Sequence, residues 1–244
     1  MSANINSQTL SSSASSTTST LTVTTDAIHT PFSCINHPFY HAIHEAHSNQ
    51  RSFQKGDINV DIYNTAITAF LTIFDALGSP IITEIVRRDF RAKTNGLRNS
   101  ARRLRAHTLR QLVVNELKSP PRFWAPSGIQ SLLWSQRILH FIQRMVQLLV
   151  DDAQRELKEA CIMAYRETLA LRHPHMTKVI FERALQLVPP RKQFLTNLCD
   201  SECLSDEDIK LCLVGMEDFL NATRPHTSAL ATLFEMEQIE DPPR

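Results

Sequence analysis

Apolar residues recur at helical spacing along most of the chain after residue 27, and this pattern constrains the fold more than any other feature. The stretch SLLWSQRILHFIQRMVQLLV, residues 131–150, shows it clearly. Trp134, Ile138, Phe141 and Met145 lie on one face of a helix with 3.6 residues per turn. No stretch alternates convincingly at period two, as a half-buried strand would. The sequence therefore predicts an all-α domain.

The periodicity predicts helices near residues 38–49, 57–78, 80–98, 104–118, 127–151, 153–172, 175–188, 190–199 and 206–235. Four prolines lie near predicted helix starts, where a missing N–H costs little: Pro80, Pro126, Pro174 and Pro190. Ser205, followed by two acidic residues, is a candidate N-cap for the last helix. Pro225 is expected to kink or divide that helix.

The composition separates a tail from a globular part. Residues 1–27 are dominated by Ser and Thr, so we predict a disordered tail there and one domain over residues 28–244. The net charge of +1 gives no general argument for nucleic acid, and five glycines are few for a glycine-rich α/β enzyme. The cysteines form no CxxC pair, which favours reduced thiols in a cytosolic protein. No apolar run approaches the roughly 18 residues of a membrane span.

The segment 80–98 carries two charged residues on the face of the predicted helix that is otherwise apolar. Asp89 and Lys93 lie in the middle of an apolar arc that includes Val86 and Leu97. The opposite, apparently solvated arc holds Arg87, Arg88, Arg91, Thr94, Asn95 and Arg98. A charge that faces a core costs several kcal/mol unless it is paired. Asp89 and Lys93 either pair with each other, being four residues apart, or form the polar mouth of a ligand pocket.

Three further residues allow two interpretations each. Trp134 is either a core residue or a platform on which a sugar ring stacks. Arg137 lies at the edge of the same apolar stripe, where it either extends to solvent or borders a pocket. His173 stands between two predicted helices and either caps carbonyls or donates a hydrogen bond into a pocket.

Three separated segments, taken in order, resemble the glycolipid transfer protein family over roughly residues 57–235. They are AFLTIFDALGSPIITEIVRRD at 69–89, LLWSQRILHFIQ at 132–143, and AYRETLALRH with VIF between 164 and 181. The resemblance implies a two-layer helical sandwich that carries one sphingolipid between membranes without catalysis or a cofactor. It implies peripheral membrane contact and, we expect, a cytosolic monomer.

The resemblance also implies residue roles. Asp89 corresponds to the Asp that binds the ceramide amide and a sugar hydroxyl, and Trp134 to the Trp beneath the first sugar. His173 corresponds to the His that bonds the ceramide carbonyl, and Arg137 to a basic residue beside the head group. Phe141 and Phe181 are expected to help line the tunnel for the chains.

The chain departs from both branches of the family. Glycolipid-binding members have Asn four residues after the Asp and Lys seven after it, where this chain has Lys93 and Gly96. Lys at the first position is the ceramide-1-phosphate pattern, but those members have Arg where this chain has Gln130 and Trp134. We favour a glycosylceramide, because phosphate binding without both arginines lacks their bidentate donors. Ceramide-1-phosphate transfer and lipid sensing without transfer are the alternatives.

Other signals are weaker. His37, His41, His44 and His47 have helical spacing, but no Cys or acidic cluster completes a zinc set, so we expect no metal site. Residues 87–110 form a basic segment that suits anionic lipid better than nucleic acid, because aromatic residues are nearly absent from it. Phe123 and Trp124 are candidate interfacial anchors. No GxSxG, HExxH or P-loop motif indicates an enzyme.

Overall fold

The computed structural model describes residues 30–45, 50–69, 71–78, 80–119, 127–199 and 204–239. Over these ranges the regular elements are helices, and the β-type pairing is one isolated bridge between Asn59 and Thr108. The helices are α1 (Ser33–Glu45), α2 (Gln50–Gln54), α3 (Val60–Ala69), α4 (Leu71–Ala76), α5 (Pro80–Leu104), α6 (Leu109–Leu117), α7 (Gly128–Asp151), α8 (Leu157–Glu167), the 3₁₀ helix η2 (Leu169–Leu171), α9 (His175–Leu185), α10 (Arg191–Cys199) and α11 (Asp206–Met236).

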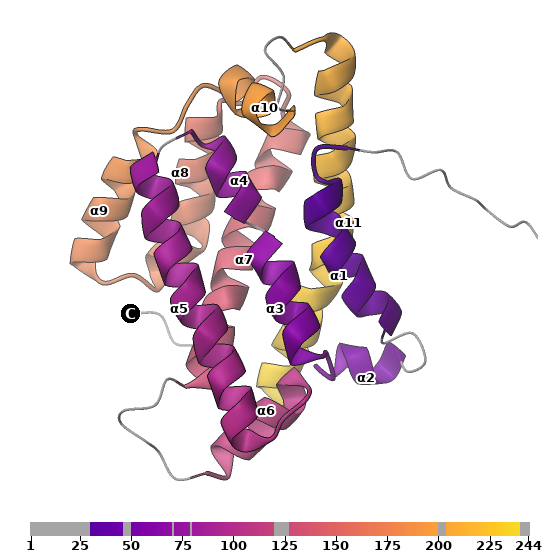
Figure 1. Cartoon of the computed structure of the whole chain (residues 1–244). Coiled ribbons are helices and arrows are strands. Elements are labelled where there is room, and N and C mark those ends of the chain that lie inside the picture. Colours follow the sequence, from indigo (N-terminus) through magenta and orange to yellow (C-terminus); the bar gives the residue numbers. More distant parts are fainter. Residues whose placement is uncertain are drawn as a thin grey trace, which may run out of the picture.

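These helices form two layers (Figure 1). Helices α1, α3 and α5 pack side by side in one layer, and α11, α7 and α8 form the other. The layers meet chiefly where α5 crosses α7 and where α1 crosses α11. Helix α9 lies at the outer edge of the sandwich, beside α8. The predicted all-α, two-layer sandwich is confirmed, whereas the predicted N-terminal tail lies outside the described residues.

Helix α7 is the centre of the fold, and part of the face opposite its apolar stripe is also packed against the protein. Gln136 is buried and donates to the carbonyl of Thr227, at 3.4 Å. Gln143 donates to the hydroxyl of Thr223, at 2.9 Å. Both partners belong to α11, which covers this part of the face. The amides satisfy their hydrogen bonds inside the protein, so the face can be polar and still be packed.

Side chains from neighbouring segments satisfy both ends of α7. At its N-terminus the Glu116 carboxylate accepts from the backbone N–H of Gly128, at 2.8 Å, and Ser127 is the N-cap. A side chain at Gly128 would come within 3 Å of Leu112, Glu116 and Ser100, so only glycine fits this close approach. At the other end the Arg191 guanidinium donates to three carbonyls. The helix that carries Trp134 is thus fixed along its length.

Several predicted boundaries and faces are corrected. Helix α5 continues to Leu104, and the predicted helix 153–172 is divided into α8 and η2. Pro225 lies within one continuous α11 and does not divide it, while Ser205 caps that helix as predicted. Thr94 is buried rather than solvated. Its hydroxyl donates to the Phe90 carbonyl of the preceding turn, at 2.9 Å, so the buried group has a hydrogen-bond partner. Among the described helices, none is long and apolar enough to cross a bilayer.

Candidate functional site

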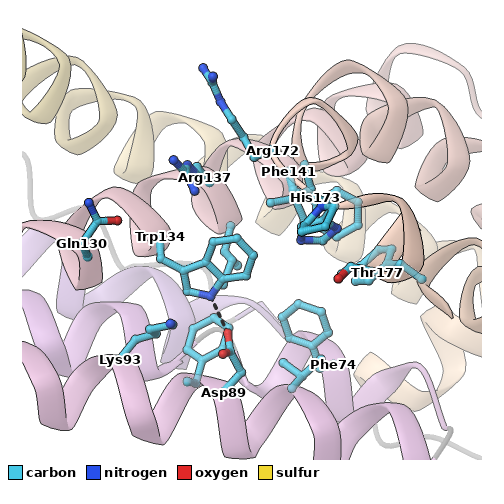
Figure 2. A pocket seen from close by; sticks show the side chains of 16 residues that line it. Phe74, Asp89, Lys93, Gln130, Trp134, Arg137, Phe141, Arg172, His173 and Thr177 are labelled. Carbon is cyan, nitrogen blue, oxygen red and sulfur yellow. Dashed lines mark hydrogen bonds between the residues drawn. The ribbon is translucent and has the colours of Figure 1, made fainter. Parts of the chain in front are cut away.

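A cavity of about 510 Å³ opens where α5, α7 and the start of α9 meet (Figure 2). All seven residues singled out from the sequence line it: Asp89, Lys93, Trp134, Arg137, Phe141, His173 and Phe181. They come from three separated segments of the chain. The structure therefore brings together every residue that the sequence predicted for the site.

Asp89 on α5 is held by Trp134 on α7. The indole Nε1–H donates to a carboxylate oxygen of Asp89, as the dashed line in Figure 2 shows. Between the described side chains of Asp89 and Lys93 there is no ion pair, so the two charges do not simply neutralise each other. A carboxylate offers about four lone-pair directions. After accepting from the indole, Asp89 can still accept hydrogen bonds from a ligand.

Two cations lie over the same indole. The Lys93 Nζ atom is 5.6 Å from the centroid of the Trp134 ring, and the Arg137 Cζ atom is 6.0 Å from it. Both distances are within the range of a cation–π attraction. Trp134 is half-buried, packed against the core on one side and facing the cavity on the other. It therefore packs on the core and also presents its ring to the cavity.

His173 lies between η2 and α9 and is buried. Its Nδ1 is 3.0 Å from the hydroxyl of Tyr165, and its ring centroid is 5.5 Å from that of Trp134. Burial, and next the charge of Arg137, lower its pKa below the ordinary value, so the imidazole is neutral at pH 7. Burial raises the pKa of Tyr165 to about 12 and keeps its hydroxyl protonated. If the hydroxyl donates to Nδ1, the proton of the imidazole is on Nε2, where it can be donated to a ligand.

An aromatic cluster leads inward from the polar mouth. Phe181 stacks on Tyr165 with the ring centroids 4.5 Å apart, and it meets Phe141 edge-on at 6.0 Å. Behind these rings lies a second, purely apolar cavity of about 30 Å³. It shares Phe74, Val86, Phe141 and Phe181 with the first cavity and extends to Ile73, Leu77, Ile142, Met145, Cys161, Ala184, Leu185 and Val188. The site thus joins a polar mouth to a narrow apolar interior.

Sequence reasoning missed part of the lining. Arg172, Thr177 and Phe74 also line the cavity, although the guanidinium of Arg172 points away from its centre in Figure 2. Thr177 could have been found, because it lies four residues before Phe181 on the same helical face. Arg172 could not have been found, since the direction of its side chain depends on the turn between η2 and α9. Asn95 and Arg98 do not reach the cavity, because α5 is unbroken past Asp89.

The remaining signals do not form a second chemical site among the described residues. His37 and His41 stack with ring centroids 6.5 Å apart, but no group of three metal-binding side chains occurs in these ranges. His47, Phe123 and Trp124 lie outside the described residues. Cys199 and Cys212 are free thiols with their Sγ atoms 2.9 Å apart.

This geometry defines a helical protein that binds an amphiphile, with a polar end at the mouth and an apolar end inside. The family model of the glycolipid transfer protein matches residues 58–200, more than half of the chain. The chain therefore belongs to the glycolipid transfer protein family, which is a family of lipid transfer proteins.

Individual relatives agree with this assignment. A glycolipid transfer protein from Aureobasidium melanogenum is 28% identical over 180 residues, covering 70% of this chain and 86% of its own. Among solved structures, the glycolipid-transfer fold of FAPP2, described as selecting simple glycosphingolipids, superposes with a TM-score of 0.72 at 20% identity, covering 88% of this chain and 99% of its own. The human ceramide-1-phosphate transfer protein in complex with its lipid has a TM-score of 0.69 at 17% identity, covering 86% and 97%. At such identities these structures support the fold alone.

Proposed function

We propose that this protein transfers a sphingolipid between membranes, with a sugar-bearing head group favoured over ceramide-1-phosphate. One observation carries the proposal. Seven residues from three segments converge on a single cavity, whose polar mouth continues into an apolar interior. That arrangement complements a ceramide, which has one polar cap and two hydrocarbon chains.

Each side chain has a defined task in this proposal. Asp89 accepts from the ceramide amide and from a hydroxyl of the head group, while the Nε2–H of His173 donates to the ceramide carbonyl. Trp134, fixed by Asp89, stacks beneath a sugar ring. The chains enter between Phe141 and Phe181. Because each buried methylene contributes about 0.8 kcal/mol, the chains supply most of the affinity and the mouth supplies selectivity.

The second cavity is too small for a hydrocarbon chain in its present form. Its volume of about 30 Å³ is close to the share of one water molecule. Phe141, Phe181 and their neighbours must therefore move apart when a chain enters. Helix α9 carries Phe181 and lies at the edge of the sandwich beside α8, so we propose that this helix shifts to admit the chain.

An exposed apolar stripe beside the mouth supports membrane docking. Met176 and Ile180 are 69% and 61% exposed, lie one turn apart on α9, and adjoin the pocket-lining stripe of Thr177 and Phe181. Leu171, just before His173, is also exposed. Such clustered apolar side chains favour an interface with a partner or a membrane. We propose that this face rests on the bilayer, so that the lipid enters through the mouth.

We further propose that the protein acts as a cytosolic monomer and performs no covalent chemistry. The free thiols of Cys199 and Cys212 suit a reducing compartment. Among the described residues that line the mouth, Asp89 and His173 are not joined by a serine, a cysteine or a second carboxylate.

Transfer between vesicles tests the proposal. Labelled galactosylceramide, ceramide-1-phosphate and phosphatidylcholine are offered separately. We expect a sphingolipid to move and phosphatidylcholine to remain, with transfer abolished by Asp89→Val and strongly reduced by Trp134→Ala. Binding without transfer would indicate a lipid sensor instead. Folded protein that neither binds nor moves any sphingolipid would refute the proposal.

A further inference from the structure

A further cavity lies at the far end of α5, away from the candidate lipid site. It has a volume of about 440 Å³ and lies between the start of α3, the end of α5 and the turn that leads into α6 (Figure 1). Its lining shares no residue with the cavity at Asp89 and Trp134. We call it the arginine groove, after Arg98, Arg102 and Arg105 in its lining.

Hydrogen bonds of the backbone fix the walls of the arginine groove. The N–H of Val60 donates to the carbonyl of His107, at 3.0 Å, and the N–H of Leu109 donates to the carbonyl of Ile58, at 2.9 Å. These two bonds join the start of α3 to the turn after α5. The walls of the groove are therefore in place before a ligand arrives, so binding does not have to order them.

Three arginines near the end of α5 make the groove cationic. Arg98, Arg102 and Arg105 follow one another at spacings of four and three residues. Asp61 supplies a carboxylate, which is 3.5 Å from the guanidinium of Arg98 on a side chain that is 82% exposed. Among the described residues, no carboxylate pairs with Arg102 or Arg105. With histidine counted as neutral, the lining has a net charge of +2.

Arg105 occupies a backbone position that favours glycine. It follows the last residue of α5, and its φ angle is +50°, in the left-handed region. Its N–H and that of Ala106 donate to the carbonyls of Arg102 and Ala101, at 3.3 and 2.9 Å, which closes the helix. A residue other than glycine is strained in this conformation. An arginine at this position, lining the groove, indicates a use for its guanidinium that offsets the strain.

The charge and the donors of the groove match a phosphomonoester. Guanidinium groups offer paired N–H donors that suit phosphate oxygens. A phosphomonoester carries a charge of about −1.5 to −2 at pH 7, which balances the groove, whereas a phosphodiester carries about −1 and leaves one cation unbalanced. Asn59 adds a donor: because its Oδ1 accepts from the N–H groups of Asp61 and Ile62, at 2.9 and 3.1 Å, its Nδ2 group can donate to a ligand.

We infer that the arginine groove is a second ligand site, which binds a phosphomonoester. The ligand is the head group of an anionic membrane lipid or a small soluble phosphate, since both present the same group. Arg102 and Arg105 bind the phosphate oxygens, and Arg98 and Asn59 complete the site. This inference goes beyond the transfer of a sphingolipid and does not depend on it, because the two cavities share no residue.

Vesicles of matched surface charge test this inference. Phosphatidylcholine vesicles contain either phosphatidic acid, a lipid phosphomonoester, or phosphatidylglycerol, a phosphodiester, each at the mole fraction that gives the same zeta potential. We expect the full chain to bind the phosphatidic acid vesicles about tenfold more tightly, the effect of one further charge-assisted hydrogen bond.

Soluble glycerol 3-phosphate distinguishes the two sources of the phosphate, because it is the head group of phosphatidic acid without the chains. Binding of glycerol 3-phosphate in a calorimetric titration would show that the groove accepts a soluble phosphomonoester. A preference for phosphatidic acid vesicles without such binding would assign the groove to a lipid at the bilayer surface. Equal binding to both kinds of vesicle, together with no binding of glycerol 3-phosphate, would overturn the inference.

Variants assign the phosphate to the groove. Arg102→Gln and Arg105→Gly should each weaken phosphomonoester binding about tenfold. Arg105→Gly should also keep or raise the melting temperature, since glycine relieves the strain, and this combination separates loss of a ligand contact from damage to the fold. Arg91→Gln is the control, because Arg91 is exposed on α5 and lines neither cavity. An equal loss in the Arg91 variant, or none in the Arg102 and Arg105 variants, would place the anion elsewhere and overturn the inference.

Discussion

Trp134 donates its indole N–H to the carboxylate of Asp89, and this single contact joins the two central helices α7 and α5 at the mouth of the cavity. The contact gives each residue two tasks. The hydrogen bond orients the indole, and the carboxylate that accepts it also lines the cavity. Loss of either partner should therefore disturb the other.

Trp134→Phe tests this coupling, because it keeps an aromatic face and removes only the donor. We expect sphingolipid affinity to fall about tenfold, the effect of losing one hydrogen bond to a charged group at the site. Asp89→Asn should cause a similar loss, and the double variant should lose less than the sum of the two. Equilibrium binding to vesicles measures all three. Asp75→Asn, which alters an exposed ion pair with Arg87, is the control and should bind normally. Full additivity of the Trp134 and Asp89 effects would show that these two residues act separately.

Tyr165 should act through His173 rather than by touching the ligand. Its hydroxyl lies 3.0 Å from Nδ1 of the imidazole, and by donating to that nitrogen it would select the tautomer that donates from Nε2. Tyr165→Phe should weaken sphingolipid binding about three- to tenfold, the range for one neutral hydrogen bond, while the order of preference among head groups is retained. Parallel titrations with two lipids of different head group measure this. A change in that order would contradict a role for Tyr165 confined to the imidazole.

The docking stripe on α9 should be needed for transfer but not for folding. Ile180→Asp places a charge on the exposed stripe beside the mouth, where it would have to be desolvated at the membrane. We expect vesicle binding and transfer to fall at least tenfold, with the melting temperature unchanged. Val214→Asp is the matched control, since Val214 is an exposed apolar residue on α11 that does not line the cavity. Equal losses in both variants would rule out a docking role specific to α9.

The sequence predicted the site better than its surroundings, for physical reasons. Asp89 and Lys93 could be found because charges on an apolar helical arc are costly and so require a partner. The burial of Gln136 and Thr94 could not be predicted, because the periodicity of one helix does not show which layer covers it. The direction of Arg172 was also hidden, because it depends on the backbone between η2 and α9. Regular helices were thus predictable, and contacts between layers and at turns were not.

Arg191 should stabilise the fold by closing the end of α7. Its guanidinium donates to the carbonyls of Leu149, Asp152 and Arg155 at 2.9, 3.0 and 3.2 Å, and the residue is only 8% exposed. Arg191→Met leaves these carbonyls without their donor, so we expect a loss of about 3 kcal/mol in the free energy of unfolding. Urea denaturation measures it. Lys192 is an exposed neighbour, and Lys192→Met should change the free energy of unfolding by less than about 0.5 kcal/mol. Similar losses in both variants would contradict the capping role of Arg191.

His226 should make the fold sensitive to acid. The ring is fully buried on α11, lies between Phe39 and Phe53 with centroids 5.0 and 5.2 Å away, and bonds the Ala222 carbonyl. Burial lowers its pKa from 6.5 to about 4. The unfolded chain therefore binds a proton below about pH 6.5 that the folded chain accepts only near pH 4. Stability should fall across that window by on the order of 3 kcal/mol, at up to about 1.4 kcal/mol per pH unit.

Replacing the imidazole isolates this contribution. His226→Leu should flatten the dependence of the free energy of unfolding on pH between about pH 6.5 and pH 4. His173 contributes in the same direction, so the effect is measured as the difference from the unmodified protein. His37→Leu, at an exposed position on α1, should leave the slope unchanged. If the His226 variant loses stability on acidification as steeply as the unmodified protein, protons taken up elsewhere in the chain drive the acid unfolding.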